Sequence, residues 1–313
     1  MSSGAVISRA IKGIVLAGMT VWLLAGCESY SEKSNKLKDT PARGVINVSA
    51  DESFKPVIDA QVMVYEAGNP GTEIKVTYKP EADCLRDLLN DSVRMVIATR
   101  GVSRAEENYI VDSLRLGPES ITVAYDAVAV IVHPQAADSF FTMPELKRIL
   151  TGENKTSFVP VFDGQQATST VRFIVDSVLK GEKLRTDAMA AKSSSEAIDY
   201  VMKNKNALGL IGVSWIGNKE DTAQVSFLRK VKIARIESTD SAGAYVLPVQ
   251  ENIYMRSYPM VRDLVYTLKE NYNGLGTGFG NFLKGEIGQL VFKRAYLVPA
   301  KRNFILRQAR LNE

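Results

Sequence analysis

From residue 44 onward, short runs of apolar and β-branched residues alternate with longer segments whose apolar residues recur at helical spacing. The short runs predict strands, and the longer segments predict helices that cover them. The expected strands cover 45–48, 74–78, 95–98, 121–124, 127–132 and 208–213. The expected helices cover 54–67, 82–89, 143–151, 169–180, 194–204, 258–272 and 278–293. This alternation predicts an α/β protein with mainly parallel sheets, and its length favours two lobes over a single sheet.

Ahead of the alternation lies a leader with a basic start, Arg9 and Lys12, and an apolar stretch at 14–24 that is short for a membrane span. The stretch closes on Leu-Ala-Gly-Cys at 24–27, which resembles the lipobox of bacterial lipoproteins. The resemblance implies cleavage before Cys27 and a lipid anchor on its thiol. An ordinary secretory signal with an incidental cysteine is the alternative. In both cases residues 1–26 are interpreted as a signal peptide.

The next segment, 27–43, is polar and charged, and it is interpreted as a lipidated flexible tether. No later stretch approaches 18 continuous apolar residues, so the expected membrane attachment is through the lipid alone.

Composition narrows the classes of function. The net charge is only +4, which does not suggest a partner such as nucleic acid. Cys27 and Cys84 are the only cysteines, so a disulfide or a cysteine-based zinc site within the mature chain is not expected. His133 is the single histidine, and no nucleophile elbow or phosphate-binding Walker loop is present. We therefore expect no enzyme activity, no cofactor and no metal.

Two strand-to-helix turns carry groups that bind anions. After the strand at 45–48, the segment 49–54 offers the Ser53 hydroxyl and unpaired backbone N–H groups; plain N-capping by Asp51 or Ser53 is the alternative. Further along, three consecutive hydroxyls, Thr168, Ser169 and Thr170, precede a helix. Hydroxyls and free N–H groups together can surround a tetrahedral anion.

A third strand end carries Thr99 and Arg100. The guanidinium of Arg100 has the fork that matches phosphate or carboxylate oxygens, although a solvated surface charge is the alternative.

Taken in order, six segments resemble the phosphate-binding components of bacterial phosphate ABC transporters. These segments are 49–54, 97–107 (IATRGVSRAEE), 125–134 (YDAVAVIVHP), 143–152 (MPELKRILTG), 168–170 and 254–261 (YMRSYPMV). The resemblance implies the two-lobed, type II-like periplasmic-binding-protein fold, in which each lobe is a mixed, mainly parallel sheet flanked by helices. Lobe one would combine 44–125 with 248–313, and lobe two would be 126–247. Two crossing segments, near 124–127 and 245–249, would form the hinge.

The resemblance also implies which residues bind the ligand. Ser53, the Phe54 backbone, Thr99 and Arg100 would donate from lobe one. The donors from lobe two would be Thr168, Ser169 and Thr170.

The chain departs from the family pattern in three places. Arg100 stands where many members have an aspartate that accepts the proton of phosphate, so another acceptor is expected, with Asp51, Glu52 and Asp163 as candidates. The arginine that precedes the family's hydroxyl loop is missing, and Arg100 or Arg172 could supply its charge. The family's third anion loop is replaced by Tyr-Lys-Pro-Glu-Ala-Asp at 78–83.

The resulting hypothesis is a monomeric, lipid-anchored binding protein on the periplasmic side of a bacterial membrane. It would capture inorganic phosphate and deliver it to the permease subunits of an ABC transporter. Two alternatives stay open: a binder of another oxyanion, such as sulfate or a phosphonate, and a surface sensor or scaffold that keeps the fold without transport.

Overall fold

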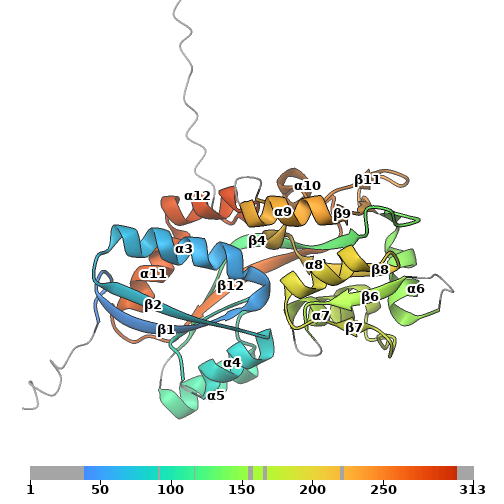
Figure 1. The fold of residues 1–313 in the computed structure, drawn as a ribbon. Coiled ribbons are helices and arrows are strands. Elements are labelled where there is room, and N and C mark those ends of the chain that lie inside the picture. Colours follow the sequence, from blue (N-terminus) through green and yellow to red (C-terminus); the bar gives the residue numbers. More distant parts are fainter. Residues whose placement is uncertain are drawn as a thin grey trace, which may run out of the picture. The chain divides into compact units, whose positions relative to one another are not determined.

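The computed structural model describes residues 39–90, 92–115, 117–153, 158–164, 168–218 and 222–301 (Figure 1). By its internal contacts the chain divides after Asp39, and the elements described all belong to the part from Thr40 onward. The predicted signal peptide, Cys27 and most of the predicted tether lie outside the described residues.

The described part is a mixed α/β structure. Its strands are β1 (Gly44–Asp51), β2 (Thr72–Lys79), β3 (Met95–Ala98), β4 (Glu119–Val132), β5 (Phe140–Phe141), β6 (Val159–Phe162), β7 (Met189–Ala190), β8 (Ala207–Gly212), β9 (Lys232–Ile233), β10 (Arg235–Glu237), β11 (Tyr245–Val246), β12 (Val261–Leu268) and β13 (Val298–Pro299). Its α-helices are α3 (Lys55–Gly68), α4 (Glu81–Leu89), α5 (Arg104–Leu114), α6 (Met143–Thr151), α7 (Ser169–Phe173), α8 (Ser194–Lys203), α9 (Thr222–Lys230), α10 (Gln250–Tyr254), α11 (Leu275–Lys284) and α12 (Glu286–Arg294). Shorter helical turns are η1 (Glu52–Phe54), η2 (Ile174–Leu179, of π type) and η3 (Val213–Trp215).

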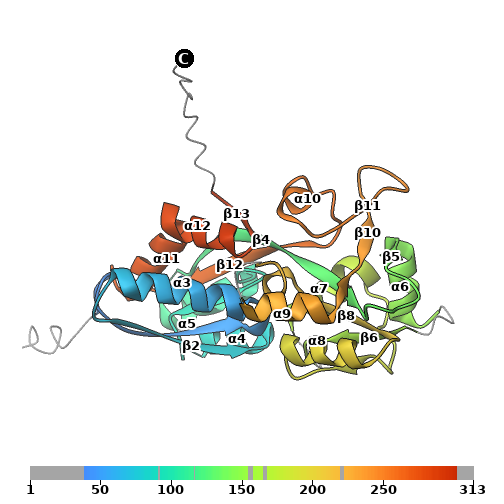
Figure 2. The same ribbon diagram turned by 45° about the horizontal axis from the view of Figure 1, so that its top comes forward.

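The main sheet has the strand order β2-β1-β3-β12-β4-β8-β6-β7, and a small second sheet has the order β11-β10-β5. The long strand β4 belongs to both halves of the main sheet: Glu119–Ala127 pairs with β12, and Val128–Val132 pairs with β8. Figures 1 and 2 show β4, in green, running from one half into the other. Neighbours β1 and β2 are parallel, as are β6 and β8, whereas β4 is antiparallel to both β12 and β8.

Each half of the main sheet has an apolar core on both faces. In the first half, α3, α11 and α12 cover one face through residues such as Val57, Phe279 and Phe292, and α4 and α5 cover the other (Figure 1). In the second half, α6 and α7 pack on one face, and α8 and α9 pack on the other. A strand buried on both faces has few polar positions, which explains the continuous apolar runs in the sequence.

Local sequence signals account for several helix starts. The Thr142-x-x-Glu145 segment forms a capping box at the start of α6: the Thr142 hydroxyl accepts the Glu145 N–H, and the Glu145 carboxylate accepts the Thr142 N–H. Ser103 and Glu106 form the same arrangement at α5, a helix that the sequence analysis did not predict.

One predicted helix is wrong. Residues 258–272 contain β12, which pairs with β3 on one side and β4 on the other. Most of β12 is buried, so its sequence, VRDLVYTL, shows no clear alternation, and a short apolar run of that kind cannot be assigned to helix or strand from its pattern. The strands predicted at 121–124 and 127–132 are parts of the single strand β4.

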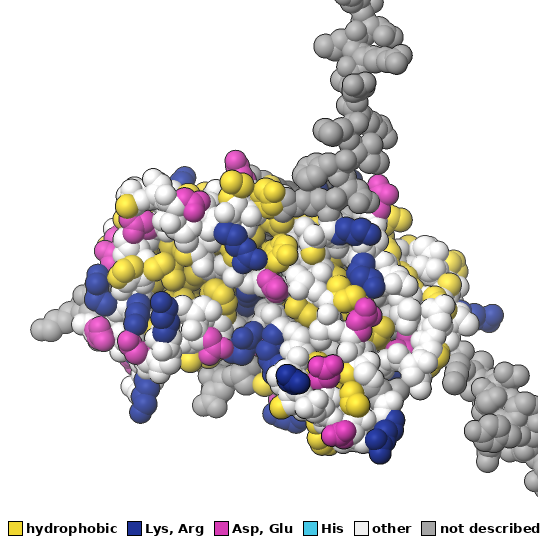
Figure 3. Space-filling view, turned by 180° about the vertical axis from the view of Figure 1, so that it is seen from behind, with side chains coloured by type: hydrophobic (Ala, Val, Ile, Leu, Met, Phe, Trp, Pro, Cys, Tyr) yellow, Lys and Arg dark blue, Asp and Glu magenta, His cyan; other side chains and the backbone are white. Residues whose placement is uncertain are grey.

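The surface of the described part carries both signs of charge. On the face shown in Figure 3, Lys and Arg side chains are interspersed with Asp and Glu side chains, and neither sign covers it. Within the described ranges, no helix is both long and apolar enough to cross a membrane.

Candidate ligand-binding site

The strands β1, β2, β6 and β7 all end at one cavity of about 360 Å³. Its lining residues follow these strand ends in the two halves of the main sheet: Asp51, Glu52, Ser53, Tyr78, Lys79, Pro80, Asp163, Gly164, Thr168, Ala190, Ala191 and Lys192. The carboxyl ends of the strands are where α/β sheets usually bind ligands, because the loops that follow neighbouring strands converge there.

A cluster of hydroxyls lies at this cavity around Asp163. Ser53 Oγ donates to Asp163 Oδ2 at 3.0 Å, and Thr170 Oγ1 donates to the same oxygen at 2.9 Å. Ser169 Oγ lies 3.4 Å from Ser53 Oγ. Thr168 lines the cavity, and its hydroxyl accepts the Val171 N–H as the N-cap of α7. The structure therefore brings Ser53 to a cluster formed by Asp163, Ser169 and Thr170, which lie 110 or more positions further along the chain.

Arg262, on β12, connects this cluster to the crossing strand β4. Its Nε donates to Asp126 Oδ2 at 2.8 Å, and its Nη1 donates to Ser169 Oγ at 3.0 Å and to Thr170 Oγ1 at 3.2 Å. The guanidinium also lies over the ring of Phe54, 5.0 Å from its centroid. Arg262 was not predicted as a site residue. A charged residue inside an apolar strand was the available signal, but residues 258–272 had been assigned to a helix.

The two halves of the sheet also meet at the backbone of Ser53 and Gly212. Ser214 Oγ donates to the Ser53 carbonyl at 2.7 Å. At Gly212, the last residue of β8, a Cβ atom would lie 2.9 Å from Arg262 Nη2 and 3.1 Å from the Ser53 carbonyl oxygen. Only a glycine leaves room for that approach.

Acidic groups dominate the buried part of the site. Asp51, Asp126 and Asp163 are each at most 5% exposed and surround the single guanidinium of Arg262. Burial raises the pKa of Asp51 to about 6, although the charge of Arg262 works against the shift. Burial likewise raises the pKa of Glu52 to about 7, against hydrogen bonds from Ser194 at the start of α8.

Burial of the guanidinium disfavours its charge, but Asp126, Asp51 and Asp163 together raise the pKa of Arg262. Four buried atoms of this group have no hydrogen-bond partner among the described residues: Asp51 Oδ2, Asp126 Oδ1, Asp163 Oδ1 and Arg262 Nη2.

Thr99 and Arg172 meet beside the cavity through Glu81, which the sequence analysis did not single out as a site residue. Thr99 donates to Glu81 Oε1 through both its N–H and its hydroxyl, and Arg172 Nε donates to Glu81 Oε2 at 2.5 Å. Arg172 Nη2 also donates to Thr99 Oγ1 at 2.6 Å. Burial alone would raise the pKa of Glu81, but Arg172 and Thr99 hold it below its ordinary value. This contact joins α4 in the first half to α7 in the second.

Arg100 is not brought to the hydroxyl cluster. Its Nη1 and Nη2 donate to the two carboxylate oxygens of Glu106 at 2.7 and 2.9 Å, and Nη1 also donates to the Gly101 carbonyl. Glu106 is held in place by the capping box of α5, so it offers Arg100 a fixed bidentate partner. The predicted role of Arg100 as a ligand donor finds no support in this geometry.

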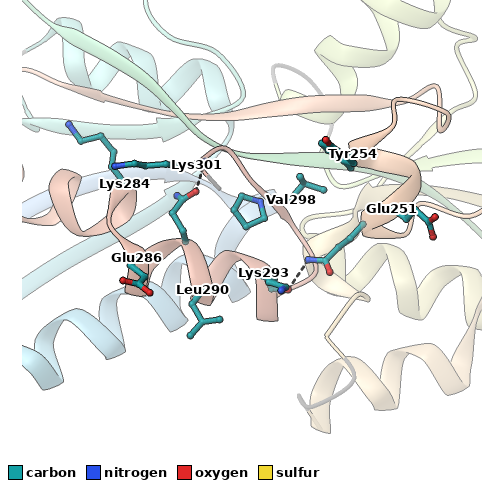
Figure 4. Close-up of a pocket in the computed structure, with 11 residues that line it drawn as sticks. Glu251, Tyr254, Lys284, Glu286, Leu290, Lys293, Val298 and Lys301 are labelled. Carbon is teal, nitrogen blue, oxygen red and sulfur yellow. Dashed lines mark hydrogen bonds between the residues drawn. The ribbon is translucent and has the colours of Figure 1, made fainter. Parts of the chain in front are cut away.

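A second cavity, of about 480 Å³, is formed by α10, α12, β13 and the end of α11, and its lining contains none of the predicted site residues. Figure 4 shows its mixed lining, in which Lys284, Lys293, Glu286 and Leu290 come from α11 and α12. It lacks a convergent set of hydroxyls and buried charges, so we place the candidate site in the first cavity.

Comparison with known proteins agrees with this architecture. Residues 37–286 match the family described as the PBP superfamily domain, and the chain therefore belongs to that family. A phosphate-binding protein PstS of Borreliella burgdorferi is 22% identical over 263 residues, which cover 78% of this chain and 86% of that protein.

Solved structures show the same fold. A putative phosphate ABC transporter substrate-binding protein with bound phosphate from Clostridium perfringens matches with a TM-score of 0.69 at 21% identity, over 82% of this chain and all of that one. An ABC-type phosphate transport receptor from Vibrio cholerae matches with a TM-score of 0.60 at 18% identity, again over 82% of this chain and all of that one. The predicted fold class, a two-lobed periplasmic-binding-protein fold, is confirmed.

Proposed function

We propose that this protein is an extracytoplasmic substrate-binding protein that captures inorganic phosphate between its two lobes and delivers it to an ABC permease. The observation that carries the proposal is the meeting of Ser53 with Ser169 and Thr170 at a cavity shared by both halves of the sheet. Three hydroxyls and the Arg262 guanidinium can replace the water around a tetrahedral anion.

The domain boundaries in this proposal are those expected from the sequence. Lobe one consists of 44–125 with 248–313, and lobe two consists of 126–247. In that division Ser53 and Arg262 belong to lobe one, and Asp163, Ser169 and Thr170 belong to lobe two. A ligand held by both sets stabilises the closed arrangement, which a permease can recognise.

Phosphate is favoured over sulfate by the acids of the site. Asp51, Glu52 and Asp163 line the cavity, and a carboxylate accepts a hydrogen bond only from a ligand that carries a hydrogen. Phosphate carries at least one hydrogen near neutral pH, whereas sulfate carries none. Sulfate oxygens beside these carboxylates would meet like charge.

The location in this proposal is the periplasmic side of a bacterial membrane, with the lipid on Cys27 as the anchor. The leader pattern and the similarity to transporter binding proteins support it. Globomycin blocks the peptidase that cleaves lipoprotein leaders, so a larger precursor of the protein should accumulate in treated cells. In a second experiment, a Cys27→Ser variant should lose its attachment to the membrane. Unchanged attachment of the variant would reject the anchor.

Isothermal titration calorimetry of the purified protein with phosphate and with sulfate tests ligand capture. We expect heat with phosphate and none with sulfate. Equal affinity for both anions would indicate a general oxyanion binder, and no heat with either would favour a sensor or scaffold.

Ser53→Ala combined with Thr170→Val should weaken phosphate binding by about 100-fold, as expected for losing two hydrogen bonds to a charged ligand. Ser238→Ala, on a distant loop, is the control.

A further inference from the structure

The candidate site carries more negative than positive fixed charge. The charged residues at or beside the cavity are Asp51, Glu52, Lys79, Glu81, Asp126, Asp163, Arg172, Lys192 and Arg262. Arg172 balances Glu81, and Arg262 balances Asp126. Lys79 Nζ pairs with Asp87 at 2.5 Å, and Lys192 is exposed at the rim. Among the residues that the structure describes, Asp51, Glu52 and Asp163 therefore have no cation of their own, and Arg262 is shared with Asp126.

Water can screen the charges of Asp51 and Asp163 only weakly, because both side chains are buried. Asp51 is 1% exposed and Asp163 is 5% exposed. Placing a doubly charged anion against two ionised buried carboxylates is strongly unfavourable, because the interaction between like charges grows as the surrounding dielectric falls. The guanidinium of Arg262, which is shared with Asp126, does not offset this repulsion.

The same two carboxylates each keep one buried oxygen, Asp51 Oδ2 and Asp163 Oδ1, without a hydrogen-bond partner among the described residues. A buried acceptor of that kind is stabilised by a donor. The hydroxyls of Ser53 and Thr170, which now donate to Asp163 Oδ2, can turn toward unprotonated oxygens of a ligand. The cavity therefore offers acceptors for two hydrogens beside donors for the remaining oxygens.

From this arrangement we propose that the site takes phosphate as the doubly protonated single anion, with Asp51 and Asp163 accepting its two hydrogens. This inference rests on the proposed function and specifies its ligand. Arg262 and the hydroxyls of Ser53, Ser169 and Thr170 donate hydrogen bonds to the two phosphate oxygens that carry no hydrogen. The bound state then adds one negative charge to the site instead of two.

Proton uptake on binding follows from the proposal. Above the second ionisation of phosphate, the dissolved ligand is mostly the double anion, and a proton must be taken up for each phosphate bound. The apparent affinity then falls about tenfold for each pH unit in that range. A site for the double anion shows no such fall.

The decisive measurement is calorimetry of the unmodified protein with phosphate at about pH 5.5 and about pH 8, each in two buffers of different ionisation enthalpy. We expect uptake of about one proton per phosphate at the higher pH. At the lower pH we expect release of up to about one proton, because Asp51, with a pKa of about 6, is then largely protonated in the free protein and must lose its proton to accept one from the ligand. Phosphate binding of equal affinity at both values, without proton uptake, overturns the inference and leaves the proposed function standing. Absence of phosphate binding at both values overturns the proposed function as well.

Perchlorate separates the need for hydrogens from the need for a single charge, because it is a tetrahedral single anion without hydrogen. We expect no perchlorate binding; an affinity equal to that for phosphate would show that the carboxylates accept nothing from the ligand.

Asp163→Asn supplies an amide donor in place of an acceptor and removes one charge. It should flatten the pH dependence of phosphate affinity and allow sulfate to bind. Asp187→Asn, which changes the same residue type at a surface pair with Arg185, should behave as the unmodified protein. If Asp163→Asn keeps the full pH dependence and still rejects sulfate, Asp163 is not an acceptor. If the Asp163→Asn variant does not fold, the number of protons taken up by the unmodified protein on phosphate binding still tests the proposal.

Discussion

At the scale of single residues, the site is organised around Arg262. Its side chain is 2% exposed, and the carboxylate of its ion-pair partner Asp126 is fully buried. Nη1 of the same guanidinium reaches the hydroxyls of Ser169 and Thr170. Removing one member of a buried pair leaves the other without compensation, which is costlier than the net contribution of the pair.

Arg262→Met should therefore lower the free energy of unfolding by about 3–5 kcal/mol, because it strands the Asp126 carboxylate. Urea denaturation followed by circular dichroism measures the change. The matched control is Arg86→Met, which breaks the exposed pair with Asp83 and should cost about 0–1 kcal/mol. A loss as small as that of the control would mean that Asp126 does not depend on Arg262.

Asp51 makes stability depend on pH in an unusual direction. Its pKa in the folded protein is about 6, above the ordinary value of 3.8, so the folded state binds the proton more tightly than the unfolded state. The stability that this proton confers is present below about pH 4 and is lost as the pH rises toward about 6.

Relative to the unmodified protein, Asp51→Asn should consequently gain stability between about pH 4 and about pH 6, by on the order of 2–3 kcal/mol. Denaturation of both proteins across this range, without phosphate, tests the sign. A difference that stays constant with pH would show that Asp51 is ionised throughout.

At the scale of elements, α4 and α7 are joined by the contact of Glu81 with Arg172. The Glu81 side chain is 2% exposed, whereas that of Arg172 is 35% exposed, so water screens one side of the pair. The two helices belong to opposite halves of the main sheet, and the pair helps to hold these halves together.

A double-mutant cycle with Glu81→Gln and Arg172→Met should give a coupling energy of about 1 kcal/mol, below that of a fully buried pair because of the screening. Unfolding in urea measures each corner of the cycle. As a control pair, Lys55 and Asp59 are exposed neighbours on α3 and should show about 0.5 kcal/mol or less. A coupling near zero for Glu81 and Arg172 would mean that the two helices are held by other contacts.

At the scale of the whole described part, β4 is shared by both halves of the main sheet, and β8 beside it ends at Gly212. Ser53 from the first half and Ser214 from the second meet at this point. The backbone of Gly212 has φ −67°, which every residue type adopts, so only the lack of space requires a glycine there.

Gly212→Ala should accordingly displace Arg262 or the Ser53 backbone and weaken phosphate binding by about tenfold or more, with a loss of stability of about 1–3 kcal/mol from overpacking. Calorimetry gives the affinity, and denaturation gives the stability. Gly68→Ala, where nothing lies within 4 Å of the added carbon, should change neither by much. Unchanged phosphate affinity in Gly212→Ala would separate this approach from ligand binding.

Some parts of this architecture could be read from the chain alone because the signals are local. The capping box of α6 and the hydroxyl-bearing start of α7 depend on residues three or four positions apart, and helices were predicted from residues 143 and 169. The strand that leads to Ser53 was also predicted, since an apolar run followed by polar residues marks the end of a strand, whereas β6, which leads to Asp163, was not predicted. Local sequence does not determine which of these polar groups contact one another.

Tertiary structure decided the partners. Arg100 and Arg262 are both arginines beside strands, yet Arg100 lies against Glu106, six positions away, whereas Arg262 lies against Asp126 and the hydroxyls of α7. The sequence by itself determined the α/β class, the family resemblance and the chemistry available at the strand ends. Only the folding of β12 between β3 and β4 selected the buried cation of the site, because pairing across a sheet joins residues that no spacing in the chain relates.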